Sequence, residues 1–468
     1  MCATEKKHET HEISINIRDR TYTNRLMNVL SDSMWPMKRN MRHMKAVNQI
    51  SDFYMRNQTA SLLVFIFLFS TCFCSSASGQ KEFGFSMPSG SKRVEIAFEE
   101  YNNLIVIPIT LNGFLTLKFI LDTGVETAIL TEKLYADIID VNYVRELKIA
   151  GPGINDSVEV YVANELTFNL PGGLVGKNMN MLVLEEDYLE LAENMGEEVY
   201  GIIGYDIFSR FTVEVNYDSK RLILHDPRRY KPKRRSTTLP IEVRRGKPYL
   251  KTSITQEKKK KALDIMIDTG ASHAALLDFG GFEANLVPEE RIVTRLGTGI
   301  AGEIPGYLSR LDTLSIGQYS FDEVLYSAPL EGTYNKTIKR GSKYGTIGGG
   351  LLHRFNVTFD YTNEKMYLQK ASRYKDSFEH DMSGMTLNAR GQNLDTLKIE
   401  SIRKDSPADL AGLKTGDIIL SINSKSLRNS RLSEIFAMLR KKEGIKIKCK
   451  VLRDGQKLRR TFRLKRLI

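Results

Sequence analysis

The stretch that decides the fold occurs twice, as Phe119-Ile-Leu-Asp-Thr-Gly124 and as Ile265-Met-Ile-Asp-Thr-Gly270. In each copy an apolar run ends in an aspartate that is followed by a Thr-Gly turn. A carboxylate at the end of a buried strand is unfavourable unless something pairs with it or uses it. Two such strand ends predict a pair of carboxyl groups, Asp122 and Asp268, that share one proton and activate a water molecule.

The repeat extends beyond these turns. Residues 200–217 align with residues 344–361 without a gap, at an offset of 344 − 200 = 144, while the two aspartates are 268 − 122 = 146 residues apart. Both segments contain an apolar-apolar-Gly pattern, Ile202-Ile203-Gly204 and Thr346-Ile347-Gly348, with threonine in the first place of the second copy. A duplication on this scale predicts two similar lobes in one chain.

These paired motifs resemble those of aspartic peptidases, specifically the retropepsin-like group in a single-chain, two-lobed form. The resemblance covers roughly residues 95–370 and implies a mainly β fold with two retropepsin-like (acid protease) β lobes in tandem. We expect lobe 1 over residues 95–228, a basic linker over 229–240 and lobe 2 over 241–371. The resemblance also implies that Asp122 and Asp268 are the catalytic residues.

The same resemblance implies roles for the residues around the two acids. Thr123 and Thr269 are expected to hydrogen-bond across the lobe interface, while Gly124 and Gly270 let the backbone approach the carboxyl groups. Ser272, just after the second turn, is expected to support the pair.

Glu126 stands where retropepsins use an aspartate to contact the substrate backbone, and a salt bridge within the lobe is the alternative role for it. Val125 and Ala271 lack the hydroxyl group that pepsin-like enzymes usually place there. With fewer hydrogen bonds to the ionised form, the pKa of the pair should be higher. We therefore expect an activity optimum at mildly acidic pH.

Two glycine-bearing hairpins occupy the places where this family carries flaps. The first is Ile149–Gly153, whose Gly151 and Gly153 are expected to contact substrate. The second is Leu296–Gly302, with Gly297 and Gly299 in the same role. The spacing of Gly297, Gly299 and Gly302 also matches a dinucleotide-binding fingerprint, but Pro305 and Gly306 would break the helix that this motif requires. We expect no cofactor.

Residues 378–468 differ in character from the rest of the chain. The pattern Ser-Pro-Ala-x-x-Ala-Gly-Leu-x-x-Gly-Asp-x-Ile from Ser406 resembles a PDZ domain of the bacterial protease type. The resemblance implies that a bound peptide adds as a strand. Its C-terminal carboxylate would be received by the backbone amides of Gly384, Met385, Thr386 and Leu387. Cys449 lies on the apolar face of a strand and is expected to be a buried structural thiol.

Residues 1–79 read as an N-terminal extension with a secretory signal. The apolar core Ser61–Ser70 is too short to span a bilayer, and small residues at 75–79 allow cleavage after Ala77 or Gly79. Residues 80–94 would form a flexible mature N-terminus. Because signals normally begin a chain, we hypothesise that translation starts at Met55; a disordered extension before an internal anchor is the alternative.

The signal predicts export to the periplasm or the extracellular space. Cys72 matches a lipoprotein signal poorly, so membrane contact is expected only if the chain is lipidated. Cys449 is the only cysteine after the leader, which excludes an intramolecular disulfide framework in the mature chain. The net charge of the 468 residues is +12. We interpret the clusters of basic residues as the solvated linker and as a hairpin tip at Lys258–Lys261. An anionic surface or nucleic acid is the lesser alternative; no aromatic-interleaved basic motif supports nucleic acid, so no nucleic-acid partner is expected.

Other chemistries have little support in the sequence. It contains neither Gly-x-Ser-x-Gly nor His-Glu-x-x-His, and the four histidines after the leader lack metal-ligand spacing: His225, His273, His353 and His380. The sequence thus predicts an exported aspartic endopeptidase that acts on peptides or proteins as a monomer. One alternative is a non-catalytic binding protein that uses the PDZ domain and a degenerate cleft. Another is a homodimer in which each lobe pairs with its twin.

Overall fold

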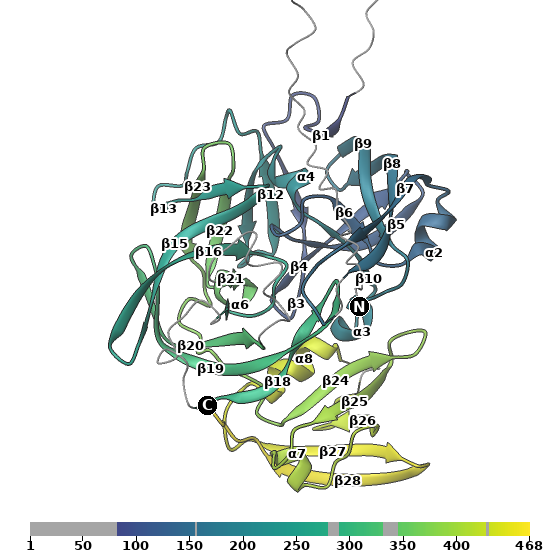
Figure 1. The fold of residues 1–468 in the computed structure, drawn as a ribbon, viewed down its shortest axis with the longest axis vertical. Helices are drawn as coiled ribbons and strands as arrows, with labels where there is room; N and C mark the ends of the chain where they lie inside the picture. Colours follow the sequence, from purple (N-terminus) through teal and green to yellow (C-terminus); the bar gives the residue numbers. More distant parts are fainter. Residues whose placement is uncertain (1–81, 155–156, 279–289, 331–344, 427–429) are drawn as a thin grey trace, which may run out of the picture. The chain divides into compact units, whose positions relative to one another are not determined.

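The computed structural model describes residues 82–154, 157–278, 290–330, 345–426 and 430–468. The compact unit that contains them begins at Lys81 (Figure 1). The expected signal peptide within residues 1–79 and the first two residues of the expected mature N-terminus lie outside the described residues. The described chain is mainly β, as expected, and its strands form four sheets.

Lobe 1 is built on a sheet whose described strands run in the order β1-β9-β6-β10-β5-β4-β8-β7, with β3 on β4. The turn between β4 and β5 is Asn112-Gly113, and both residues have positive φ (49° and 71°), as a tight hairpin requires. The bounds are β1 (Gly84–Ser86), β3 (Glu99–Tyr101), β4 (Leu104–Leu111), β5 (Leu115–Leu121), β6 (Ala128–Leu130), β7 (Asn142–Ile149), β8 (Val158–Leu170), β9 (Leu174–Leu184) and β10 (Val199–Ile203).

Lobe 2 is built on a second sheet, in the order β14-β15-β16-β21-β17-β20-β19-β18. The lysine-rich segment that follows β15 forms the tip of the β15–β16 hairpin, as expected. The bounds are β14 (Glu242–Arg244), β15 (Lys247–Gln256), β16 (Lys259–Asp268), β17 (Ala275–Leu277), β18 (Ile292–Gly299), β19 (Gly302–Ile316), β20 (Tyr319–Pro329) and β21 (Gly345–Gly348).

The two sheets share one topology. Strand β10 lies parallel to β5, with Ile203 beside Leu121, and antiparallel to β6. Strand β21 lies parallel to β16, with Ile347 beside Ile267, and antiparallel to β17. In each lobe, therefore, the strand that carries the apolar-apolar-Gly pattern is inserted beside the strand that delivers the aspartate.

A third sheet joins the two lobes, which the sequence did not indicate. Its order is β13-β23-β22-β11-β12-β2, and the central pairing of β11 with β22 places Val215 opposite Val357. Strand β13 comes from the last residues of the expected linker. The bounds are β2 (Arg93–Ala97), β11 (Thr212–Asn216), β12 (Arg221–His225), β13 (Thr237–Pro240), β22 (Phe355–Asp360) and β23 (Lys365–Lys370).

One apolar core runs through both lobes beneath this shared sheet. Phe208 of lobe 1 packs edge-on against Phe359 of lobe 2, with ring centroids 5.4 Å apart at 83°. Burial of such aromatic side chains supplies a large part of the stabilisation between packed elements. The lobes are thus joined by a continuous hydrophobic interior as well as by strand pairing.

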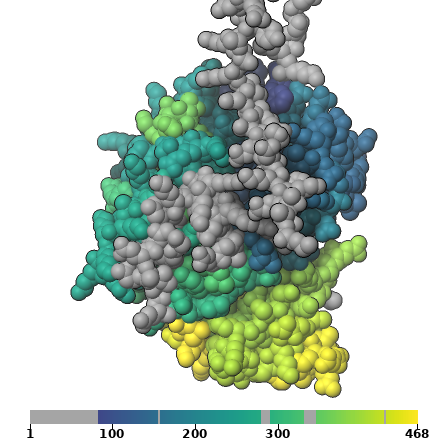
Figure 2. Space-filling view, in the orientation of Figure 1, coloured from purple at the N-terminus to yellow at the C-terminus, as the bar shows by residue number. Residues whose placement is uncertain are grey.

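The C-terminal domain is a separate sheet with its own core, in the order β24-β25-β26-β27-β28 (Figure 1). Its residues are the yellow-green and yellow ones in Figure 2. The Ser406 side chain accepts a hydrogen bond from the Asp409 N–H, as the helix start at Pro407 predicts. Cys449 is buried, as expected. The bounds are β24 (Met385–Arg390), β25 (Thr396–Ile402), α7 (Pro407–Leu410), β26 (Ile418–Ile422), α8 (Leu432–Leu439), β27 (Lys446–Arg453) and β28 (Gln456–Arg463).

The helices described in the lobes are short: α2 (Lys133–Ile138), α3 (Leu191–Met195), α4 (Tyr205–Phe208) and α6 (Gly349–Leu352). Residues 185–198 are rich in acidic side chains, and only the short helix α3 forms among them. Asp187 Oδ1 accepts hydrogen bonds from the N–H groups of Leu189 and Glu190, which makes a turn before the helix. Gly196 then ends the helix in the left-handed conformation (φ 66°).

Candidate active site

Two turns at the ends of parallel-paired strands form the centre of the site. Asp122 follows β5, and its N–H donates to the Ile203 carbonyl at 2.8 Å. Asp268 ends β16 and pairs with Gly348 on β21. The glycine of each apolar-apolar-Gly pattern is needed because a Cβ at Gly204 would overlap the Asp122 carbonyl oxygen, and one at Gly348 would overlap the His273 carbonyl oxygen.

The expected threonine contacts across the lobe interface are present. The N–H of Thr123 donates to Thr269 Oγ1 and the N–H of Thr269 donates to Thr123 Oγ1, both at 3.1 Å. Each hydroxyl in turn donates to a carbonyl of the opposite lobe at 2.7 Å, Thr123 to Ile267 and Thr269 to Leu121. Both threonines are about 1% exposed. This closed set of four bonds fixes the two turns relative to each other.

The two carboxyl groups meet in this frame. A side-chain hydrogen bond joins Asp122 and Asp268. The Gly124 N–H donates to Asp122 Oδ1 at 2.6 Å, and the Gly270 N–H donates to Asp268 Oδ1 at 3.0 Å. A Cβ at Gly270 would overlap the Asp122 carboxyl group, so only glycine allows this approach.

The two acids differ electrostatically. Burial raises the pKa of Asp268 well above its usual value, and the charge of Asp122 raises it further. Burial also raises the pKa of Asp122, but hydrogen bonds from Gly124 and from Asp268 oppose the rise. The two groups titrate as one pair that shares a proton, and the stronger upward shift of the pKa at Asp268 favours that residue as the proton donor.

Two residues near the pair were missed from the sequence. The positive charge of Lys247 lowers the pKa of both aspartates. The pKa of Tyr361 is raised well above its usual value by burial and then by the charges of the two acids. Its hydroxyl is buried without a hydrogen-bond partner among the described residues. Tyr361 and Tyr217 close the two repeated segments, so the duplication alone could have indicated this tyrosine.

The tips of the two expected flaps contact each other. The Ala301 N–H, between β18 and β19, donates to the Pro152 carbonyl, between β7 and β8, at 2.9 Å. A Cβ at Gly153 would overlap the backbone at Ala301, and one at Gly299 would overlap the Pro152 carbonyl. A Cβ at Gly151 would lie 3.0 Å from Ile300 Cβ, whereas one at Gly297 would meet no atom within 4 Å. Three of the four flap glycines thus lie at the contact between the tips.

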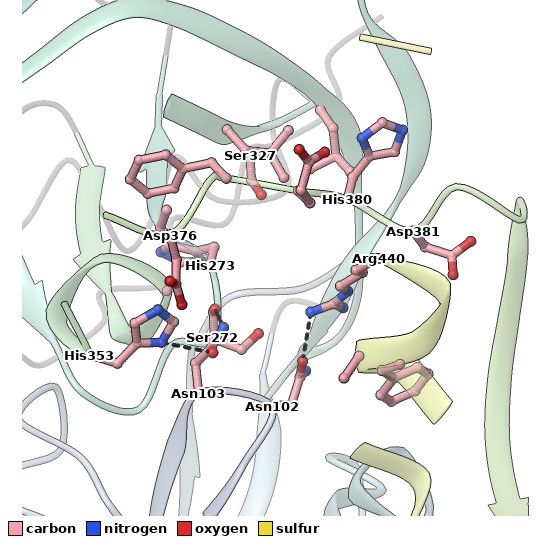
Figure 3. Close-up of a pocket in the computed structure, with 18 of the residues that line it drawn as sticks. Asn102, Asn103, Ser272, His273, Ser327, His353, Asp376, His380, Asp381 and Arg440 are labelled. Atoms are coloured by element: carbon pink, nitrogen blue, oxygen red, sulfur yellow. Dashed lines mark hydrogen bonds between the residues drawn. The ribbon is translucent and has the colours of Figure 1, made fainter. Parts of the chain in front are cut away.

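Glu126 and Ser272 are the other two residues that were expected beside the acid pair. Glu126 is exposed and forms no salt bridge with another described residue. The Ser272 carbonyl accepts a hydrogen bond from Asn103 Nδ2 of lobe 1 at 2.9 Å (Figure 3). Asn103 Oδ1 also bonds His353 Nδ1 at 3.0 Å. The turn after Asp268 is therefore held by a lobe 1 asparagine that the sequence did not single out.

The PDZ-type loop already has hydrogen-bond partners for its first amides. The Gly384 N–H donates to Asp381 Oδ1 at 2.8 Å, and the Met385 N–H donates to Ser383 Oγ at 3.1 Å. Gly384 has a φ of 83°, and a Cβ there would overlap the Ser406 side chain. Thr386 Oγ1 accepts from the Ser401 hydroxyl at 2.9 Å, and Leu387 packs into the domain core.

His273 lies beside the second turn and bonds Thr346 Oγ1 at 2.6 Å; burial lowers the pKa of the ring to about 4. Within the described ranges, no group of three or more His, Cys, Asp or Glu side chains is placed to hold a metal ion. Likewise, none of the helices in the described residues has the length and apolar character that a membrane span needs.

Two family models match parts of the chain. The family described as aspartyl protease matches residues 107–207, within lobe 1, and the family described as PDZ domain matches residues 398–453. Lobe 2 lies outside the first match, although its strands repeat the same topology.

Curated relatives match part of the chain. The chain is 32% identical to the carboxy-terminal processing protease CtpB of Bacillus subtilis (strain 168) over 132 residues, 28% of this chain and 27% of that protein. It is 29% identical to CtpA of the same organism over 143 residues, 30% of each chain. It is 34% identical to a probable CtpA-like serine protease of Staphylococcus haemolyticus (strain JCSC1435) over 83 residues, 17% of each. The chain thus spans less than a third of the length of these relatives. It combines an aspartyl protease domain with a C-terminal PDZ domain, the architecture that the sequence motifs implied.

Proposed function

We propose that this protein is an aspartic-type endopeptidase in which Asp122 and Asp268 activate a water molecule. The observation that carries the proposal is the hydrogen-bonded carboxyl pair, held by the reciprocal bonds of Thr123 and Thr269. Two carboxyl groups with unequal proton affinity provide a base and an acid in one place.

The reaction follows from this asymmetry. Ionised Asp122 accepts a proton from water as the water oxygen attacks the scissile carbonyl carbon. Asp268 gives its proton to the carbonyl oxygen, which produces a neutral tetrahedral diol. The diol collapses as one hydroxyl proton returns to Asp268 and Asp122 gives the amide nitrogen the proton that it took from water. The C–N bond breaks, and a new carboxyl end and a new amine end result.

A serine-type peptidase is the second candidate, because curated relatives are named serine proteases. The match to those relatives covers 17% to 30% of this chain, which leaves at least 70% of the chain outside it. The acid pair supports the aspartic mechanism instead. A serine-directed phosphonate discriminates between the two, since it would inactivate a serine enzyme and leave an aspartic one active.

Peptide-library cleavage followed by mass spectrometry tests the proposal directly. Asp122→Asn and Asp268→Asn should each abolish cleavage. Asp264→Asn is the matched control, since Asp264 lies on the same strand β16 and pairs with Arg244 away from the site. Cleavage that persists in both dyad variants would refute the acid pair. A wild-type protein that binds peptides without cutting them would favour the non-catalytic binding protein.

An aspartyl protease domain and a PDZ domain are both consistent with binding of peptides or proteins. Recognition of free C-termini by the PDZ domain, export through the segment before residue 80 and a monomeric state are parts of the proposal. The monomer is supported by the presence of both acids in one chain. N-terminal sequencing of the native protein tests processing near residue 79, and analytical ultracentrifugation tests the oligomeric state.

A further inference from the structure

The positive charge of the chain is concentrated at its C-terminal end. Residues 441–468 contain twelve Lys/Arg and two Asp/Glu, so this stretch carries 12 − 2 = +10. The whole chain carries +12, and residues 1–79 carry 10 − 6 = +4, which leaves 12 − 4 − 10 = −2 for residues 80–440. A charge asymmetry of this size indicates a segment that binds an anionic partner.

The basic segment contains the last two strands of the PDZ domain, β27 and β28, which form one end of its sheet (Figure 1, in yellow). The odd-numbered residues of β27, from Ile447 to Val451, are buried in the domain core. Its even-numbered residues therefore lie on the opposite face. The register places odd-numbered residues of β28 beside them, and together they make up what we call the basic face: Lys446, Lys448, Lys450, Leu452, Lys457, Arg459, Thr461 and Arg463. Six of the eight are exposed, while Lys450 and Leu452 are half-buried.

Like charges stand directly opposite each other on the basic face. Lys446 is the cross-strand partner of Arg463, and Lys450 is the cross-strand partner of Arg459. The Cβ atoms of such partners are roughly 5 Å apart, so two cations at these positions repel each other. None of the six cations of the basic face forms an ion pair with a described residue. The repulsion is therefore not relieved within the described part of the chain.

The acidic residues nearest in the sequence do not neutralise this face. Asp417 pairs with Arg453 at 2.6 Å. Glu443 Oε1 accepts a hydrogen bond from the Arg466 N–H at 3.3 Å, and Asp454 lies at the turn between the two strands.

The edge position of β28 explains only part of the pattern. Charged residues on an edge strand often prevent it from pairing with another chain, and this accounts for the cations of β28. It does not account for Lys446, Lys448 and Lys450, because β27 is paired on both sides. The fold itself thus has no need of the cations on β27, and an external anionic partner gives them a role.

The character of the basic face favours an anionic membrane surface as that partner. Two rows of cations along a ribbon present several charges to a flat surface at once. None of the eight residues is aromatic, whereas proteins that bind single-stranded nucleic acid stack bases on aromatic side chains. Leu452 lies among the cations, and Leu467, beyond the end of β28, is 37% exposed. Apolar side chains beside cations also occur in segments that lie at the membrane interface.

We propose that the basic face of β27 and β28 binds the anionic headgroups of a phospholipid membrane. Each Lys or Arg held near such a surface strengthens binding about fivefold, and added salt weakens the attraction. From the sequence, membrane contact was expected only with lipidation, whereas the basic face provides a contact that needs no lipid anchor. This inference goes beyond the proposed peptidase function and does not depend on it.

Vesicle flotation of the full chain tests the proposal. Vesicles of phosphatidylcholine alone are compared with vesicles that also contain phosphatidylglycerol, at low salt. Binding to the anionic vesicles should be at least about tenfold stronger, and the difference should disappear in about 0.5 M salt. Equal binding to the two kinds of vesicle would overturn the proposal.

Two variants with equal loss of charge locate the contact. Binding to anionic vesicles should fall at least about a hundredfold in the basic-face variant, which combines Lys446→Gln, Lys450→Gln, Arg459→Gln and Arg463→Gln. It should stay within about twofold of wild type in the matched control, which removes four exposed cations from the β15–β16 hairpin of lobe 2: Lys251→Gln, Lys258→Gln, Lys259→Gln and Lys260→Gln. Unchanged binding in the first variant, or an equal loss in the second, would refute the basic face as the site. Any contribution of residues 1–79 is common to all these proteins and cancels.

Lys450→Glu separates a loss of binding from a loss of folding. A glutamate at this position faces Arg459, so a repelling pair becomes an attracting one and the thermal midpoint should not fall. The affinity for anionic vesicles should nevertheless fall by at least about tenfold, because the charge changes by two. Unchanged affinity in this folded variant would contradict the proposal.

Competition with a DNA duplex decides between the two kinds of anionic partner. Wild-type protein that stays on anionic vesicles when duplex is added at equal phosphate concentration supports the membrane. Complete displacement from the vesicles by the duplex would overturn the membrane proposal and assign the basic face to nucleic acid. A protein that floats with anionic vesicles but cuts no peptide would refute the proposed function and leave this inference standing.

Discussion

Thr123 and Thr269 each accept a hydrogen bond from the other's backbone N–H at the same distance, 3.1 Å, although they lie 146 residues apart. Each hydroxyl also donates to the carbonyl that precedes the opposite aspartate by one residue. The position of one catalytic candidate is thereby defined by the backbone of the other lobe. Neither lobe can form the acid pair alone.

Thr123→Val and Thr269→Val should each lower kcat by at least about tenfold, because a displacement of the turns separates the carboxyl groups. Each change leaves a buried N–H without its acceptor, which costs about 1–3 kcal/mol of unfolding free energy. Thr→Ser at either position is the control, since it keeps the hydroxyl group. Valine variants with normal kcat would show that the bonds do not position the acids.

The pH–rate profile should be bell-shaped with its maximum at mildly acidic pH. Its acidic limb reports the ionisation of Asp122, whose pKa is raised by burial. Its basic limb reports loss of the Asp268 proton, and because burial and the Asp122 charge raise that pKa further, the limb lies at higher pH. Measurement of kcat/KM from pH 2 to 8 tests this, and a maximum near pH 2 would contradict it.

Asp268→Asn should stabilise the protein at neutral pH. A carboxyl group whose pKa is higher in the folded than in the unfolded state disfavours folding above its unfolded pKa, near 3.8, and has no effect well below it. Asparagine removes this penalty and can still donate to Asp122. Thermal unfolding should show a higher midpoint for the variant at pH 7 and equal midpoints at pH 3.

The control for that measurement is Asp264→Asn on the same strand, which loses its ion pair with Arg244 and should give no gain at pH 7. A gain for Asp268→Asn that is equal at both pH values would show that the effect does not come from ionisation.

Gly204→Ala and Gly348→Ala should destabilise the protein by more than about 3 kcal/mol, or prevent folding, because the added Cβ overlaps backbone carbonyls of the turns that carry the acids. Chemical denaturation measures the loss. Gly90→Ala is a control at a loop glycine where a Cβ meets no atom within 4 Å; its positive φ of 77° limits the expected cost to about 1 kcal/mol. Comparable losses at all three positions would refute the overlap.

Gly299→Ala should lower kcat/KM by about tenfold with little change in stability. The added methyl group overlaps the Pro152 carbonyl and separates the flap tips, which lie outside the large core shared by the two lobes. Gly297→Ala, two residues earlier in the same hairpin, meets no atom within 4 Å and carries only the backbone strain of its φ of 158°, so it should retain more activity than Gly299→Ala. Equal losses in both variants would indicate a general effect of hairpin flexibility.

Local signals in the sequence identified most of the elements around the acids. The strand ends at Asp122 and Asp268 are set by neighbouring residues, and the structure has them where they were predicted. The Asn112-Gly113 turn and the helix Leu432–Leu439 also depend on short-range signals. The reciprocal threonine bonds followed from the family resemblance, because the motif fixes both partners.

Features that depend on distant contacts could not be predicted. Nothing local in Val213–Val215 indicates that it pairs with residues 357–359 of the other lobe. The loop capping by Asp381 and the contact of Asn103 with Ser272 likewise join residues whose local sequence is unremarkable. The acidic stretch 185–198 had a helical composition, but the turn at Asp187 and the left-handed Gly196 shortened it to α3.

The shared sheet has a consequence for how the two halves depend on their covalent connection. Strands β11 and β12 of one half and β22 and β23 of the other are hydrogen-bonded neighbours, and the buried core crosses the same boundary. A protease nick in the exposed segment near Arg234 and Arg235 would cut the polypeptide without cutting the sheet. The two fragments should stay associated through strand complementation, and the nicked protein should elute intact on gel filtration and separate only in denaturant.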